Sequence, residues 1–127
     1  MFNRRKAFLK RELKKINRII EETPWRYDIV KKGKEYIREG VRNDYDRLKE
    51  RIDACDVRAG DEKKKSKMDN KIIKDMAELK GKTEVEVKQL EEQLKELDAE
   101  ILEVDGTMVG RVEAARQYKM IVDKLLI

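Results

Sequence analysis

The chain has 127 residues and a net charge of +5, with 46% of its residues charged and 39% hydrophobic. Soluble globular domains usually contain about 45–50% apolar and about 25% charged residues, so this composition argues against a compact globule with a wide core. It favours long helices that share a narrow apolar core. No apolar run approaches the roughly 20 residues that a transmembrane helix needs.

Residues that carry out chemistry are scarce in this sequence. Histidine is absent, which removes the commonest general base and the commonest transition-metal ligand. Cys55 is the single cysteine, so no intrachain disulfide can form. We therefore expect a protein that is not an enzyme and that holds no metal, cofactor or small-molecule ligand. We expect it in the cytoplasm or in a particle assembled inside a cell.

The first predicted helix covers residues 3–22. Its apolar residues Leu9, Leu13, Ile16 and Ile20 are spaced by four, three and four, which is the spacing of one helix face. The other faces are basic, and residues 1–20 carry a net charge of +7. The cations available for contact with a nucleic acid are Arg4, Arg5, Lys6, Lys10, Arg11, Lys14, Lys15 and Arg18.

Thr23 and Pro24 predict a kink and the start of a second helix, over residues 24–59. Threonine is a favourable N-cap, and proline is tolerated at the first helical position. Trp25 either packs into this corner or anchors a partner, since tryptophan is favoured in interface hot spots. The apolar face is expected at Val30, Gly33, Ile37, Val41, Tyr45, Leu48, Ile52, Cys55 and Ala59. Close approach of a neighbouring backbone would explain Gly33 and Gly40.

A polar loop is predicted at residues 60–67, where Gly60 fits a helix stop and a lysine-rich run follows. A third helix is expected over residues 67–80. Gly81 interrupts it, and Thr83 with Glu86 three residues later forms a capping box. This signature predicts a fourth helix over residues 83–126.

The clearest periodic signal lies in the fourth helix. Apolar residues alternate at spacings of three and four, which is typical of the a and d positions of a coiled coil. This core seam consists of Val87, Leu90, Leu94, Leu97, Ile101, Val104 and Met108. A single stripe of this kind cannot bury itself, so it requires a partner helix.

Beyond Met108 the seam continues after one extra residue, which resembles a stutter. Its expected continuation is Val112, Ala115, Tyr118, Val122 and Leu125. Four large apolar residues then lie outside the seam, and we expect them to form a surface for a second partner. This C-terminal surface consists of Met120, Ile121, Leu126 and Ile127.

The predicted fold class is an all-α antiparallel helical hairpin, or coiled coil, in a single domain over residues 1–127. Folding the chain at residues 60–67 gives two arms of nearly equal length, and their charges are complementary. Residues 1–34 carry a net charge of +8, and residues 83–105 carry −7. The sequence leaves open whether the basic first helix faces this acidic stretch or an external polyanion.

Two families share features with this chain. Its helix–middle–helix layout resembles prefoldin-type chaperone subunits, which carry β-hairpins between their helices, whereas here only Thr83–Val87 alternates. The pattern Leu97-Asp98-Ala99-Glu100-Ile101, followed by Gly106 through Leu126, is similar to short coiled-coil proteins of tailed-phage structural and assembly genes. That similarity covers about a quarter of the chain and contains no diagnostic motif.

We therefore expect a structural or assembly protein that acts through coiled-coil contacts with a protein partner or with further copies of itself. The resemblance to phage proteins implies a component of a larger particle such as a virion. One alternative is a nucleic-acid-binding module that uses the basic first helix. A second alternative is a helical chaperone or adaptor.

Overall fold

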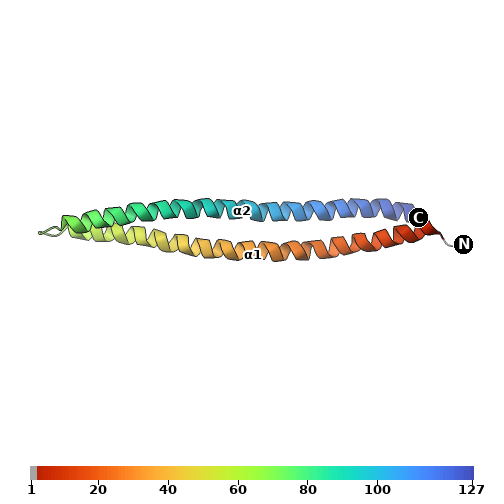
Figure 1. Ribbon diagram of the computed structural model, residues 1–127, viewed down its shortest axis with the longest axis horizontal. Coiled ribbons are helices and arrows are strands. Elements are labelled where there is room, and N and C mark those ends of the chain that lie inside the picture. The colour runs from red at the N-terminus through yellow and green to blue at the C-terminus, as the bar shows by residue number, and fades with distance from the viewer. Residues whose placement is uncertain (1–2) are drawn as a thin grey trace. The chain divides into compact units, whose positions relative to one another are not determined.

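The computed structural model describes residues 3–127 and contains two long helices, α1 (Arg4–Lys63) and α2 (Asn70–Leu126) (Figure 1). The two helices pack against each other as the antiparallel arms of an all-α hairpin, and the described residues include no strand. The predicted fold class is therefore confirmed.

The structure contains two helices where the sequence predicted four. α1 continues through Pro24 and Gly60, and α2 continues through Gly81 and Thr83. The predicted helix boundaries at residues 22–24, 60 and 80–83 are therefore wrong. An interior glycine costs only about 1 kcal/mol and a proline about 3 kcal/mol. Packing along a long helix outweighs such local costs. A bend at Pro24, which lacks a backbone N–H, stays a prediction.

The glycines are also not explained by close packing within the chain. A methyl group placed on Gly33 or Gly40 would meet no heavy atom within 4 Å. The expectation that a neighbouring backbone approaches these two residues is therefore wrong for the chain by itself.

The turn between the helices covers residues 64–69, slightly later than the predicted loop at 60–67. Asp69 is the N-cap of α2, because its Oδ1 accepts a hydrogen bond from the backbone N–H of Lys71 at 2.9 Å. The backbone N–H of Asp69 in turn donates to Oε1 of Glu62 at 3.0 Å. Glu62 is buried and also pairs with Lys65 at 2.9 Å. Its carboxylate therefore ties the end of α1 to the start of α2.

The chain divides into two compact units, and each contains a segment of both helices. The terminal unit comprises Met1–Glu35 and Ala99–Ile127, and the loop unit comprises Tyr36–Asp98. The core of the terminal unit is formed by Leu9, Ile16 and Val122, with Leu13, Ile20, Ala115 and Leu126 packed against them. The core of the loop unit is formed by Leu48, Ile52 and Val87, with Tyr45 and Leu90 packed against them. Cys55 is buried, as predicted.

Candidate interaction surface

The predicted core seam is buried or half-buried along its whole length. Val87 and Ile101 are buried, and the half-buried members are Leu90, Leu94, Leu97, Val104 and Met108. In the loop unit the seam also includes Thr83, which is only 2% exposed. Its Oγ1 donates a hydrogen bond to the carbonyl oxygen of Leu79 at 2.7 Å, so the buried hydroxyl is satisfied. The predicted capping box is therefore wrong, because Thr83 is a core position inside α2.

The buried face of α1 differs from the prediction in the terminal unit. Val30 is 50% exposed, whereas Lys31 and Lys34 are half-buried. Nζ of Lys31 donates to Oδ2 of Asp105 at 3.0 Å, and Nζ of Lys34 donates to Oε2 of Glu100 at 3.1 Å. Long lysine side chains can bury their alkyl stems while their ammonium groups reach water or a carboxylate, which is consistent with the half-buried state of both residues.

The loop unit shows the same replacement at its own first residues. Ile37 is 55% exposed, and Arg38 is half-buried instead. Nη1 of Arg38 donates to Oδ1 of Asp98 at 3.0 Å. Further along this unit, Nζ of Lys80 donates to Oδ1 of Asp56 at 2.8 Å. The predicted apolar positions Val41, Tyr45, Leu48, Ile52, Cys55 and Ala59 are buried or half-buried.

A stutter in α1 explains why its buried face moves from Val30 to Lys31. The half-buried positions Thr23, Tyr27 and Lys31 are separated by four and four residues, where a regular heptad would alternate three and four. The sequence prediction missed this stutter because Pro24 was interpreted as a helix boundary.

The stutter predicted in α2 is confirmed, since Val104, Met108 and Val112 are also separated by four and four residues and are half-buried or buried. Tyr27 and Met108 line one surface hollow of about 430 Å³ in the terminal unit. The two stutters therefore lie opposite each other. Trp25 lines the same hollow but is 65% exposed, so its predicted packing role is wrong and its role as a partner anchor stays a prediction.

After the stutter, Val112, Ala115 and Val122 are buried or half-buried as predicted, but the other two predicted positions are not. Tyr118 and Leu125 are 43% and 49% exposed, and Lys119 and Leu126 occupy the half-buried positions instead. Leu126 packs against the core of the terminal unit. Its assignment to the predicted C-terminal surface is therefore wrong.

A second apolar line runs along the C-terminal part of α2. Its residues, Ala114, Tyr118, Ile121 and Leu125, are all exposed and are spaced by four, three and four. We call this set the C-terminal stripe. Met120, on another side of α2, is also exposed, and so is Ile127, which follows the last residue of the helix. Three of the four residues predicted for the C-terminal surface are thus exposed.

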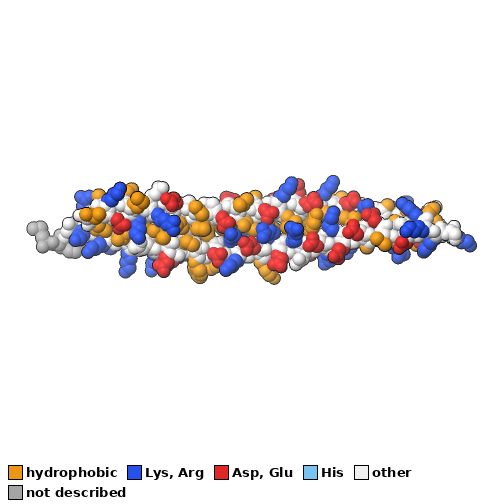
Figure 2. Space-filling view, turned by 180° about the vertical axis from the view of Figure 1, so that it is seen from behind, with side chains coloured by type: hydrophobic (Ala, Val, Ile, Leu, Met, Phe, Trp, Pro, Cys, Tyr) orange, Lys and Arg blue, Asp and Glu red, His pale blue; other side chains and the backbone are white. Residues whose placement is uncertain are grey.

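Among residues 3–127, exposed hydrophobic residues are concentrated in the terminal unit, which contains twelve of the eighteen large ones. Phe8 and Ile19 of α1 are among them. Figure 2 shows hydrophobic side chains lying beside lysine and arginine side chains near the grey terminal residues. The terminal unit therefore presents apolar and cationic groups together on its surface.

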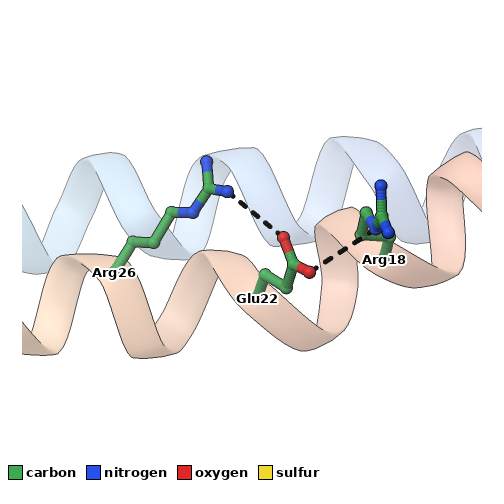
Figure 3. A network of polar contacts seen from close by, with 3 residues as sticks. All are labelled: Arg18, Glu22 and Arg26. Carbon is green, nitrogen blue, oxygen red and sulfur yellow. Dashed lines mark hydrogen bonds and ion pairs between the residues drawn. The ribbon is translucent and has the colours of Figure 1, made fainter.

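The eight cations predicted for nucleic-acid contact, Arg4 to Arg18, are all exposed. Within residues 3–127, their ion pairs stay inside α1: Lys15 lies 3.5 Å from Glu12, and Arg18 lies 3.5 Å from Glu22. Glu22 is shared, because its other oxygen lies 3.3 Å from Arg26 (Figure 3). The acidic stretch of α2 instead contacts the later residues Lys31, Lys34 and Arg38.

Hydrogen bonding shifts the pKa of several groups in these contacts. The hydrogen bond and the negative charge of Asp105 raise the pKa of Lys31 above its ordinary 10.5, and Asp56 raises the pKa of Lys80 in the same way. The hydrogen bond from Lys65, together with that from the backbone of Asp69, lowers the pKa of Glu62. The contacts of Lys31 and Lys80 join α1 to α2, and that of Glu62 lies at the turn.

Residues 3–127 contain no group of three or more histidine, cysteine, aspartate or glutamate side chains arranged to hold a metal ion. Neither α1 nor α2 combines the length and the apolar character that a bilayer-crossing helix needs. Comparison with known proteins found no matching family model, no matching curated protein and no matching solved structure.

Proposed function

We propose that this protein is a structural or assembly component that binds another helix along the C-terminal stripe. The observation that carries the proposal is the heptad spacing of Ala114, Tyr118, Ile121 and Leu125 on a face of α2 that the other arm does not cover. Apolar residues at spacings of four and three are what one helix presents to another.

The energetic argument for a partner is direct. Tyr118, Ile121 and Leu125 each leave about half of their surface in water. Full burial of a large apolar side chain contributes about 1.5–3 kcal/mol, so covering the remaining halves would add roughly 2–4 kcal/mol in total. A contact of this size is enough to orient a docked helix within a larger assembly, such as the virion that the sequence resemblance implies.

The test uses a variant that removes the stripe without cutting the core. Deleting the last residues would remove Leu126, which packs in the core of the terminal unit, so Ile121→Asp is the better change.

The partner itself can be captured by a photo-reactive residue at position 121 of the full chain, expressed in the cells that normally produce the protein. This residue should cross-link to one defined protein or to a second copy. The same group at the exposed position Glu92 should not. Loss of selectivity between the two positions would contradict the proposal.

A second candidate function is binding to a polyanion such as nucleic acid, favoured by the exposed cations Arg4 to Arg18 that no residue of α2 pairs with in the described part of the chain. Each neutralised phosphate releases a counterion, so the affinity of a real site would fall steeply with salt. Non-specific binding has a Kd of about 10⁻⁴–10⁻⁶ M at physiological salt. A Kd below about 10⁻⁷ M for duplex or single-stranded nucleic acid would place this function first.

A further inference from the structure

The segments around the C-terminal stripe carry far more positive charge than the chain as a whole. Residues 3–20 and residues 108–127 together contain twelve cations and three carboxylates. Their net charge is +9, whereas the whole chain carries +5. Both segments belong to the terminal unit. Any molecule that covers the stripe is therefore exposed to a strongly positive field.

This charge decides against a second copy of the chain as the occupant. Two copies that paired stripe to stripe would bring a net charge of +9 against +9. Charges that flank a heptad seam select the partner, and like charges brought together across an interface cost several kcal/mol. The partner that complements this unit is negatively charged.

Another feature of the terminal unit, on α1, has the same mixed chemistry. Arg11, Lys14, Lys15, Arg18 and Ile19 line a surface hollow of about 580 Å³. Two of these cations already contact Glu12 and Glu22 of α1, so carboxylates are groups that this surface accommodates. The hollow lies on the face of α1 opposite the buried Leu9 and Ile16, so it repeats the chemistry of the terminal unit but is separate from the stripe.

We infer that the partner of the C-terminal stripe is an acidic amphipathic helix of another protein. The inference rests on the proposed function and adds the charge and the secondary structure of the partner. The stripe extends over residues 114–125, which is about 16 Å of helix, so roughly three turns of the partner make contact. The aliphatic side chains of Ile121 and Leu125 have neither a positive charge nor a hydrogen-bond donor with which to bind a phosphate backbone. A stripe one residue wide is narrower than the broad apolar face of a membrane-surface helix.

The experiment measures binding of the full chain to a fluorescent peptide about three heptads long, with Leu and Ile at a and d and Glu at e and g. The acidic peptide should bind, and Ile121→Asp should weaken binding at least tenfold. The double change Arg111→Glu with Lys124→Glu, at the exposed cations three residues before Ala114 and three residues after Ile121, should also weaken it about tenfold, and added salt should act in the same direction. Val85→Asp, an exposed change in the loop unit, is the matched control and should leave binding unchanged.

Four control ligands make the result specific. A peptide of the same composition with its heptad order scrambled, and a peptide with every Glu replaced by Lys, should both bind at least tenfold more weakly. Equal binding of either peptide would overturn the inference. The inference would also be overturned if anionic vesicles or duplex DNA bound more tightly than the acidic peptide and Ile121→Asp abolished that binding. Light scattering gives the oligomeric state of the chain alone. A dimer that Ile121→Asp converts to a monomer would overturn the inference, because the stripe would then bind a second copy.

The outcome separates this inference from the proposed function. A defined protein cross-linked through position 121, combined with no binding of the acidic peptide, would overturn the acidic partner while the docking function stands. No selective cross-link at position 121, combined with no effect of Ile121→Asp on the peptide, would overturn both.

Discussion

Lys31 and Asp105 lie 74 positions apart in the sequence and are joined by a hydrogen bond of 3.0 Å between Nζ and Oδ2. Both side chains remain partly exposed, at 33% and 42%. Pairs of this kind contribute little to stability, but a mismatched pair opposes the wrong alignment of two helices. We regard this pair as a device that fixes the register of the two arms in the terminal unit.

Exchanging the two charges tests this role. Lys31→Asp alone would place two carboxylates in contact, and Asp105→Lys alone would place two ammonium groups in contact. Each single variant should therefore melt at a lower temperature than the parent, and the double variant should recover most of the loss. Thermal melts followed by circular dichroism measure this, with Lys32→Asp, whose lysine contacts Asp28 within α1, as the control for helix charge. A double variant as unstable as the sum of the singles would show that the pair has no specific role.

The core seam of the loop unit can be tested with two valines that lie two residues apart. Val87 is 5% exposed and packs against Leu48 and Ile52, whereas Val85 is 58% exposed. Val87→Asp should reduce the free energy of unfolding by at least about 3 kcal/mol, because it buries an unpaired charge. Val85→Asp should change it by less than about 0.5 kcal/mol. Urea unfolding followed by circular dichroism gives both values, and equal losses would contradict the assigned seam.

The interior glycines predict an increase in stability. A methyl group on Gly81 would meet no atom within 4 Å, and α2 continues through this position. Gly81→Ala should therefore raise the free energy of unfolding by about 0.5–1 kcal/mol. Ala77→Gly, at an exposed position of the same helix, should lower it by a similar amount. Destabilisation by Gly81→Ala would indicate an unrecognised contact at this position.

Glu62 predicts that the turn weakens in acid. Its pKa lies below the ordinary 4.5 because it accepts hydrogen bonds from Lys65 and from the backbone of Asp69. A carboxyl group whose pKa is lowered by folding stabilises the folded state fully when the pH is above its pKa in the unfolded chain. This stabilisation is lost as the pH falls through its pKa in the folded chain. The difference in melting temperature between the parent and Glu62→Gln should thus be constant at pH 6–7 and shrink below about pH 4.5. A difference that stays constant down to pH 3 would show that ionised Glu62 does not hold the turn.

Much of the fold could be predicted from the sequence because the apolar periodicity extends over many turns. The seven residues of the core seam and the burial of Cys55 follow from spacing alone. The helix boundaries could not be predicted, because local signals at Pro24, Gly60 and Thr83 are weak compared with packing along a long partner helix.

The buried face of α1 near Lys31 escaped prediction for a different reason. Sequence periodicity is defined by apolar residues, and here the half-buried positions of α1 are lysines while Val30 is exposed. The register at Tyr118 and Lys119 was missed likewise, because the apolar residue was preferred over the cation next to it. The existence of an exposed apolar surface near the C-terminus could be predicted, but its residues depend on that register.

The opposed stutters at Tyr27 and Met108 restrict how the length of such a chain can change during evolution. An insertion or deletion between the turn and the stutter of one helix would shift that stutter along the hairpin, away from the stutter of the other helix. Each stutter would then pack against a regular heptad. Changes that keep the two in step must occur in both helices, at equal distances from the turn, in steps of seven or eleven residues. Descendants and ancestors of this sequence should therefore differ in length by paired indels, a pattern that would identify distant relatives after side-chain identity has been lost.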